Sequence, residues 1–458
     1  MTGTDETGAA AKWRAFRYGP WEDTAVVPRA RPDEVTRAEM DLPATLLPVP
    51  DDGVVQRPVF DPAALHHVFG MRLGEPSFAD AAVGERWYEA RRHALHHVLA
   101  ALAQSPWAGH LVLRGSMLLA SWFGEAAREP GDLDFVVVPD TWQPADDRTD
   151  RMLDGIAAAA EALSHRGGPV RLDAHAAVGD EIWSYDRVPG RRLVIPWTAE
   201  ADGVPAGSVQ LDFVFHERLP APAEPTEIRG PQGTAPVLVR AATPALSLAW
   251  KVLWLVSDLH PEGKDLYDAV LLAECTELPF ALLREVFRGV DGGSFDRHPV
   301  LLQTLSEIAG DWSELRKEYP DRTGFAGAGP CVEHEYVDRL VTALEPTFAR
   351  DDGSGDTAAY RQRAAWFASL TAEFAEVLAG RGMDAVQALL LDRNVTFDNT
   401  VVITRELSGR DGSALRDAAA VVAEFRRDHP AVVRRTWLLA DPDEVVRQLS
   451  GDAGGASG

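Results

Sequence analysis

The stretch that most constrains the fold of this chain is residues 110–139, HLVLRGSMLLASWFGEAAREPGDLDFVVVP. Its first part predicts a β-strand over 110–113, a turn at Gly115 and Ser116, and an apolar helix over 117–123. Backbone N–H groups at the start of a helix have no partner within the helix and attract anions. A strand that leads through a Gly-Ser turn into a helix therefore predicts a site for phosphate groups.

A second predicted strand follows a Pro-Gly break and begins with Asp132-Leu133-Asp134-Phe135. Because side chains alternate across a strand, Asp132 and Asp134 share one face, whereas Leu133 and Phe135 face a core. Two carboxylates this close repel each other unless a cation lies between them. Mg²⁺ suits such a pair, since it is often bound by one or two carboxylates together with substrate phosphates. A phosphate site beside a carboxylate pair is the minimum that phosphoryl or nucleotidyl transfer requires.

A third carboxylate occurs in a later predicted strand, 208–215, which repeats the Leu-Asp-Phe context around Asp212. If this strand neighbours the first one, Asp212 joins the face that carries Asp132 and Asp134. The alternative is a solvent-facing Asp on an edge strand. The other β-segments of this region are predicted at 170–177, 181–188 and 192–197, with a hairpin turn at Pro189-Gly190 between the last two.

A predicted helix over 245–257 is apolar nearly all round, which is typical of a buried helix. Thr243 and Pro244 before it suit the N-cap and the first helical turn. Lys251 is its only charged residue, and a lysine is rarely buried unless it is paired. Lys251 therefore either extends to the surface or reaches a triphosphate or a carboxylate in the cleft.

These motifs, in this order, resemble the AbiEii-type toxins of bacterial toxin–antitoxin and phage-defence systems, which are nucleotidyltransferases of the polymerase-β superfold. Their pattern is roughly G-[GS]-x-x-L, then R-x-[ST]-x-D-[IL]-D-[FL], then a helix with one Lys, and then [RK]-D-[LIV]-x-D. The matching residues are Gly115, Ser116, Leu119, Arg128, Asp132-Leu133-Asp134-Phe135, Lys251 and Lys264-Asp265-Leu266-Tyr267-Asp268. Pro130 departs from the pattern, because the family usually has Ser or Thr there. The resemblance covers roughly residues 85–275.

The resemblance implies an α+β fold: a polymerase-β-like nucleotidyltransferase core, with a mixed sheet flanked by helices, followed by an α-helical C-terminal region. It implies that Asp132 and Asp134 hold two Mg²⁺ ions, with Asp212 joining one of them. It also implies that Gly115 and Ser116 bind the β- and γ-phosphates of a nucleoside triphosphate (NTP).

The same resemblance assigns Lys251 to the neutralisation of phosphate charge. Asp265 and Asp268 are three residues apart, so they share a helix face. Either of them would orient Lys251 or act nearer the acceptor. The implied protein is a toxin that adds nucleotides to RNA, at the 3′ end of tRNA, and is held in check by a cognate antitoxin.

A chain of 458 residues is long for one domain. We predict an irregular Pro-rich N-terminal arm over 1–60, a nucleotidyltransferase domain over 61–240 and an α-helical domain over 241–458. The first residues do not resemble a signal peptide, and the longest apolar runs fall short of the roughly 18 residues of a membrane span. A cytoplasmic location without a membrane partner is therefore expected.

The net charge of −25 is the wrong sign for a protein that binds nucleic acid over its whole surface. It is compatible with a local basic groove, and equally with a small cationic acceptor. Three hypotheses remain: an RNA-modifying toxin, a small-molecule nucleotidyltransferase of the aminoglycoside type, and a non-catalytic descendant that binds nucleotide or a partner. A basic groove beside the Asp-x-Asp strand would favour the first hypothesis, an acidic pocket the second, and the intact carboxylates argue against the third.

Overall fold

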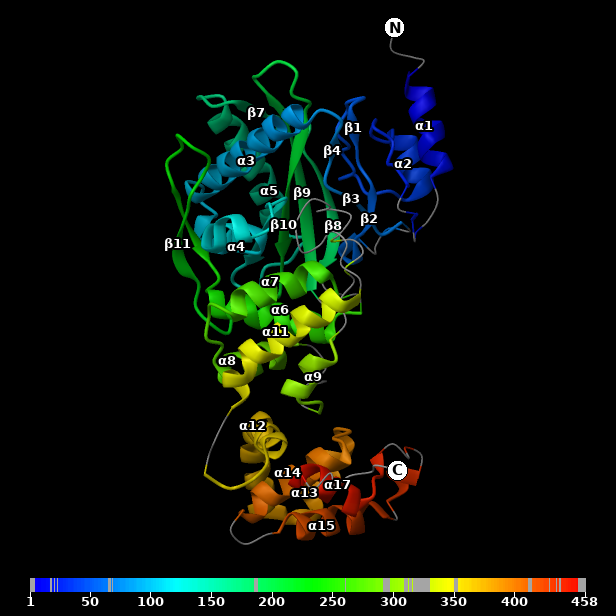
Figure 1. Ribbon diagram of the computed structural model, residues 1–458, viewed down its shortest axis with the longest axis vertical. Coiled ribbons are helices and arrows are strands. Elements are labelled where there is room, and N and C mark those ends of the chain that lie inside the picture. Colours follow the sequence, from blue (N-terminus) through cyan, green and yellow to red (C-terminus); the bar gives the residue numbers. More distant parts are fainter. Residues whose placement is uncertain are drawn as a thin grey trace. The chain divides into compact units, whose positions relative to one another are not determined.

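The computed structural model describes residues 5–451 except 17, 18, 20, 23, 65, 66, 68, 185–187, 260, 291–296, 309–311, 313, 314, 316–329, 350–352, 411–413, 428, 434, 436 and 437. It divides into two compact units, one formed by Met1–Cys275 with Ala309–His334 and the other by Thr276–Ile308 with Glu335–Gly458. The first unit contains a large mixed sheet, and the second is helical in its described part (Figure 1). The α+β prediction is confirmed.

The described part of the first unit is built on an eight-stranded mixed sheet with the order β11-β12-β5-β6-β10-β9-β7, in which β8 also pairs with β9. The pairs β6–β10 and β5–β12 are parallel, and the other neighbours are antiparallel. The strands are β5 (Leu111–Arg114), β6 (Asp132–Val137), β7 (Val170–Leu172), β8 (Val178–Ser184), β9 (Val188–Ala199), β10 (Gly207–Val214), β11 (Glu224–Ile228) and β12 (Val237–Ala241).

The alternation expected for the two Leu-Asp-Phe strands is confirmed. The side chains of Leu133, Phe135, Leu211 and Phe213 are at most 1% exposed. The rings of Phe135 and Phe213 stack with their centroids 5.5 Å apart. Burial of these apolar side chains fixes the register of β6 against β10, because a slip by one residue would turn them away from the core.

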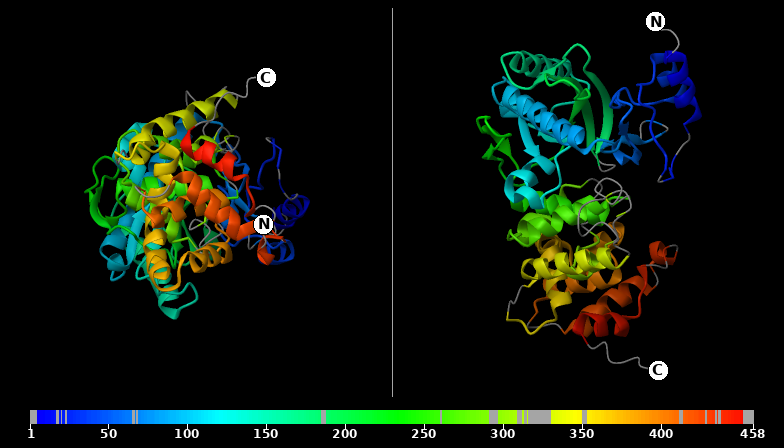
Figure 2. Two further views of the ribbon diagram at one scale, coloured as in Figure 1. Left: turned by 90° about the horizontal axis from the view of Figure 1, so that it is seen from below. Right: turned by 45° about the horizontal axis from the view of Figure 1, so that its top comes forward.

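Helix α3 (Ala81–Ala103) contacts α5 (Asp147–Ser164) and the strands β7, β10 and β12, as Figure 1 and Figure 2 show. The N-cap of α3 is Asp80, whose side chain accepts a hydrogen bond from the backbone N–H of Ala82. Helix α4 (Ser116–Phe123) follows β5 directly and contacts β5 and β6. The helix predicted after the Gly-Ser turn is therefore present.

The hairpin turn predicted at Pro189-Gly190 is wrong. Both residues lie inside β9, where Pro189 pairs with Trp183 and Gly190 with Ile182. A Cβ on Gly190 would lie 2.8 Å from the Ile182 side chain and 2.8 Å from the carbonyl oxygen of Phe213. The glycine therefore marks a close approach of three strands rather than a turn.

Residues 1–60, expected to be an irregular arm, contain α1 (Asp5–Ala15), α2 (Glu34–Met40) and the strands β1 (Val54–Val55) and β2 (Pro58–Phe60). Strand β2 pairs with β3 (Met71–Leu73), and β1 pairs with β4 (Ser77–Phe78). A small apolar cluster holds the region together, with Trp13, Val27, Leu42, Leu46, Phe69 and Met71 buried and Phe16 and Trp21 packed against it. Tyr18, also expected in this packing, lies outside the described residues.

Two helices that follow residue 240, α6 (Pro244–Ser257) and α7 (Gly263–Ala273), group with the first unit. The remaining helices are α8 (Phe280–Arg288), α9 (Leu302–Ser306), α11 (Pro330–Phe348), α12 (Ala358–Arg381), α13 (Met383–Asp392), α14 (Phe397–Ser408), α15 (Leu415–Arg427), α16 (Pro430–Val433) and α17 (Pro442–Ser450). None of the described helices combines the length and the apolar character needed to cross a bilayer.

Candidate active site

The turn between β5 and α4 brings the backbone against both carboxylates of β6. Gly115 has a φ of +81°, a conformation that residues with a side chain rarely adopt. A Cβ at this position would lie 2.2 Å from Oδ2 of Asp134. The hydroxyl of Ser116 donates a hydrogen bond to Oδ1 of Asp132 over 3.3 Å. Glycine is thus required at 115 by conformation and by space, and the first N–H groups of α4 lie beside the carboxylate pair.

Asp212 lies on the same face of the sheet as the Asp-x-Asp pair. In the parallel ladder of β6 and β10, Asp212 is the partner of Asp134, and Gln210 is the partner of Asp132. Parallel partners project to the same side, so the structure brings all three carboxylates together. Asp212 is not on an edge strand, since β9 pairs with β10 on its other side.

The charge of Asp212 is balanced by an arginine that was not predicted. Arg192 of β9 donates two hydrogen bonds to Asp212, over 2.9 and 2.8 Å, and its Nη1 lies 2.7 Å from Asp61. All three side chains are buried. Burial raises the pKa of Asp212 and Arg192 lowers it, and the result stays above the ordinary value. Burial lowers the pKa of Arg192, but the carboxylates of Asp212 and Asp61 raise it, so that it ends well above its usual range.

Asp134 lies close to two other carboxylates of the site. Burial, together with the nearby charges of Asp132 and Asp212, raises the pKa of Asp134 to about 8, although Arg114 and Lys251 act in the opposite direction. Arg114, the cross-strand partner of Asp134, also lies 2.6 Å from Glu217. A cation next to Asp132 and Asp134 would relieve this repulsion.

The donor set fits Mg²⁺ in the form that nucleotide-dependent enzymes use. Within the described residues, no group of three or more His, Cys, Asp or Glu side chains is placed to hold a metal ion by itself. Two carboxylates beside a helix start provide part of an oxygen shell, which substrate phosphates and water complete for Mg²⁺. Asp132 and Asp134 are the residues that would hold it.

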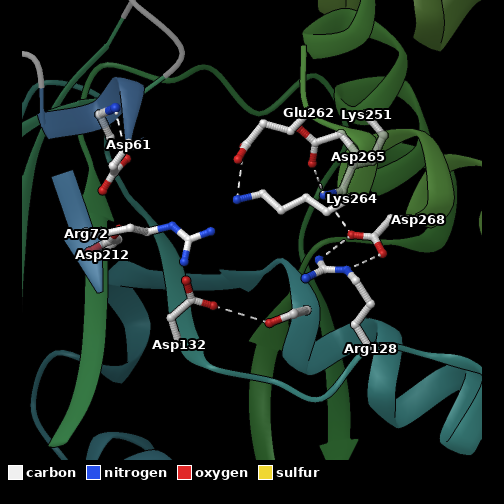
Figure 3. A network of polar contacts seen from close by, with 12 residues as sticks. Asp61, Arg72, Arg128, Asp132, Asp212, Lys251, Glu262, Lys264, Asp265 and Asp268 are labelled. Carbon is white, nitrogen blue, oxygen red and sulfur yellow. Dashed lines mark hydrogen bonds and ion pairs between the residues drawn. The ribbon is translucent and has the colours of Figure 1, made fainter. Parts of the chain in front are cut away.

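Lys251 lies in a buried network rather than at the surface. Its side chain is 7% exposed, and its Nζ lies 2.6 Å from Asp265 and 3.0 Å from Asp268, both on α7. Arg128, from the loop before β6, donates two hydrogen bonds to Asp268, over 3.0 and 2.7 Å. These contacts form one ion-pair network that joins α6, α7 and the loop before β6 (Figure 3).

The pKa shifts in this network agree with mutual neutralisation. Burial lowers the pKa of Lys251, but Asp265 and Asp268 raise it, so that it ends above its ordinary value. Burial raises the pKa of Asp268, but Arg128 and Lys251 lower it, so that it ends below its ordinary value. The lysine is therefore held charged in a buried position, as the paired alternative requires.

The network and the carboxylates line one cavity of about 120 Å³. Gly115, Ser116, Asp132, Asp134, Asp212, Lys251 and Asp265 lie along it. Sequence reasoning missed several further lining residues, among them Asp61, Arg72, Arg192 and Glu262, and did not assign Lys264 a role. Figure 3 shows Arg72 and Lys264 extending toward the space in front of Asp132 from opposite sides.

Comparisons with known proteins relate the chain to one family. Residues 97–323, about half of the chain, match the family model "Nucleotidyl transferase AbiEii toxin, Type IV TA system". Among solved structures, the chain is similar to MenT4, a nucleotidyltransferase toxin from Mycobacterium tuberculosis H37Rv, with 17% sequence identity and a TM-score of 0.38 over 62% of this chain and 92% of that one. No curated protein matches the chain. Through its residues 97–323, the chain belongs to the AbiEii family of nucleotidyltransferase toxins of type IV toxin–antitoxin systems.

Proposed function

We propose that this nucleotidyltransferase transfers a nucleoside monophosphate from an NTP to the 3′ end of an RNA, with tRNA as the acceptor and Mg²⁺ as the cofactor. The observation that carries the proposal is the contact between the Gly115 turn and Asp134. The glycine leaves room for no side chain, so the backbone that would bind phosphate directly adjoins the carboxylate that would bind metal.

The roles of the residues follow from their charges. The first N–H groups of α4 and the Ser116 hydroxyl would bind the leaving phosphates, and Asp132 and Asp134 would hold Mg²⁺. Bound there, Mg²⁺ would lower the pKa of the attacking hydroxyl and neutralise charge on the pyrophosphate. Asp212 would contribute negative charge from the neighbouring strand while Arg192 limits its repulsion with Asp134.

Lys251 would add positive charge at the inner end of the cavity, next to the leaving phosphates. Asp265 and Asp268 would act as positioning residues, since both carboxylates form ion pairs with the ammonium group of Lys251 in the buried network. The ion pair between Arg128 and Asp268, at 2.7 Å, further connects Lys251 to the loop that precedes Asp132.

The choice between RNA and a small cationic acceptor rests on the residues around the carboxylates. Basic and acidic side chains line the cavity together, and Arg192 and Arg128 are engaged by Asp212 and Asp268. Arg72 and Lys264 extend toward the space in front of Asp132 (Figure 3), and basic side chains in that place favour a polyanionic acceptor. The net charge itself favours the alternative, a small cationic acceptor of the aminoglycoside type.

A toxin of this class would act in the cytoplasm and be inhibited by a cognate antitoxin. The experiment that tests the proposal is transfer from each of the four α-³²P-labelled NTPs to total tRNA and, in parallel, to a panel of aminoglycosides, with and without Mg²⁺. Label in tRNA that requires Mg²⁺ and is lost with Asp134→Asn supports the proposal. Label only in a small molecule would replace it with the alternative.

A further inference from the structure

A second cavity, of about 150 Å³, adjoins the first one at the Asp-x-Asp strand. The two cavities share lining residues, among them Ser116, Asp132, Gln210 and Lys264. Gly115, Asp134 and Lys251 line only the first cavity, where the leaving phosphates are proposed to bind. Asp132 and Ser116 thus line both spaces, whereas Gly115 of the proposed phosphate site lines only the first.

The wall of the second cavity comes from two sources. Ser208 and Gln210 alternate with buried Val209 on β10 and so face the same side as Asp212. Glu75 and Arg91 come from the segment before residue 97, where the family match begins. This cavity is therefore built partly by sequence that the family model does not include.

Arg91 gives the second cavity an anion-binding group. The residue is 4% exposed, and its Nη1 donates to both oxygens of Glu75, over 3.0 and 2.7 Å. Its Nε and Nη2 are buried and have no hydrogen-bond partner among the described residues. The guanidinium also lies over the rings of Trp87 and Tyr88, 5.3 and 4.9 Å from their centroids. The N–H groups of Nε and Nη2 are the donors that remain for a phosphate oxygen.

Phosphoryl transfer requires the attacking and leaving oxygens to lie roughly in line with the transferred phosphorus. If the leaving phosphates bind at Gly115 and Ser116, the nucleophile approaches Asp132 from the other side. Because the second cavity adjoins Asp132 and contains the buried Arg91, we propose that it binds the terminal nucleotide of the RNA acceptor, with the phosphate of that nucleotide on Arg91. The inference rests on the proposed function and adds the residues that select the acceptor.

The test uses the full-length enzyme and separates the KM for tRNA from the KM for NTP. Ser208→Phe fills the cavity with a ring. The double variant Glu75→Gln/Arg91→Gln removes both charges of the ion pair, so that neither buried partner is left as an unpaired charge. Arg151→Gln, at an exposed position on α5, is the control for loss of an arginine.

We expect both variants to raise the KM for tRNA roughly tenfold or more. Ser208→Phe occupies the space of the nucleotide, and the Glu75/Arg91 double variant loses a charge-assisted phosphate contact. The KM for NTP should stay unchanged, as should both constants in the Arg151→Gln control. In the double variant, the slope of log KM for tRNA against log salt should also fall by about 0.7, the value for one phosphate contact on a single strand.

Two results would overturn the inference while leaving the proposed function intact. A raised KM for NTP with an unchanged KM for tRNA would mean that the cavity holds the nucleoside of the NTP. Unchanged constants in both variants would mean that it holds neither substrate. If the wild-type enzyme labels no RNA, the proposed function fails and the inference fails with it. If Ser208→Phe does not fold, as judged by its melting curve, the double variant decides.

Discussion

Replacing Lys251 by Met should destabilise the first unit, and the structure sets the size of the effect. Asp265 is 3% exposed in its side chain and forms an ion pair with no second basic residue among those described. Asp268 retains Arg128. Removing one partner of a buried ion pair typically costs about 3–5 kcal/mol. From the sequence alone, Met at this position of an apolar helix would be expected to be neutral or stabilising.

The assay is urea unfolding followed by tryptophan fluorescence, for which the buried Trp250 and Trp254 on the same helix are useful reporters. The double variant Lys251→Met/Asp265→Asn should recover most of the loss, because no lone carboxylate remains. Nucleotide transfer by this stable double variant should still fall by roughly tenfold to a hundredfold, the worth of one hydrogen bond to a charged phosphate.

Two results would refute this reasoning about Lys251. If the free energy of unfolding of the single variant lies within about 1 kcal/mol of wild type, as for ordinary substitutions, the ion pair with Asp265 contributes little to stability. A double variant that is stable and fully active would limit Lys251 to a structural role.

Three shorter predictions follow. Asp134→Asn should abolish transfer and leave the free energy of unfolding unchanged or higher, because it removes a charge whose buried position raises its pKa to about 8; retained Mg²⁺-dependent transfer would contradict the site assignment. Gly115→Ala should lower nucleotide affinity and stability, because its Cβ would collide with Asp134, whereas Gly109→Ala, with nothing within 4 Å, should do neither in the same binding and melting assays. Asp268→Asn should be less stable than wild type at neutral pH, and the difference should shrink below about pH 4. The folded-state pKa of Asp268 is lowered, so this carboxylate stabilises the fold above its unfolded-state pKa and loses that effect as the pH falls through the folded-state pKa. Urea unfolding at several pH values checks it, and a constant difference would contradict it.

Local signals predicted much of the fold. The Thr243 side chain caps α6 by accepting a hydrogen bond from the N–H of Leu246, as its position before Pro244 indicates. Apolar residues at helical spacing predict helices over 280–288 and 383–392, and the structure has both with these bounds. Helix α14 (Phe397–Ser408) is not predicted by the sequence pattern, because its N-cap Thr396 and its first-turn residues Asp398 and Asn399 also favour turns.

The site divides in the same way. Asp132, Asp134 and Asp212 could be assigned to one face because alternation along a strand is a local rule. Arg192 and Arg72 could not be predicted as site residues. The pairing of β9 with β10, and the position of the N-terminal segment at the cavity, depend on contacts between residues distant in sequence. Lys251 is intermediate. Its burial could be predicted from the helix, and Asp265 and Asp268 were both candidate partners, but the structure was needed to show that Lys251 contacts both and that Arg128 joins them.

Asp212 is the residue for which the sequence and the structure suggest different roles, and Asp212→Asn distinguishes them. As a metal ligand, Asp212 should affect the Mg²⁺ concentration that gives half-maximal transfer. As the partner of Arg192, it should affect stability, by about 3–5 kcal/mol when the buried pair is broken. Because both oxygens of Asp212 accept from Arg192, we expect the second outcome.

Asp61→Asn is the matched control for Asp212→Asn, since Asp61 binds the other side of the same guanidinium at 2.7 Å. Both variants should unfold at lower urea concentration than wild type, while the Mg²⁺ requirement should rise only in Asp132→Asn. An Mg²⁺ requirement that rises in Asp212→Asn and not in Asp61→Asn would make Asp212 a metal ligand. It would also mean that an ion competes with Arg192 for Asp212, because Arg192 and Gln210 already occupy three of the roughly four lone-pair sites of this carboxylate.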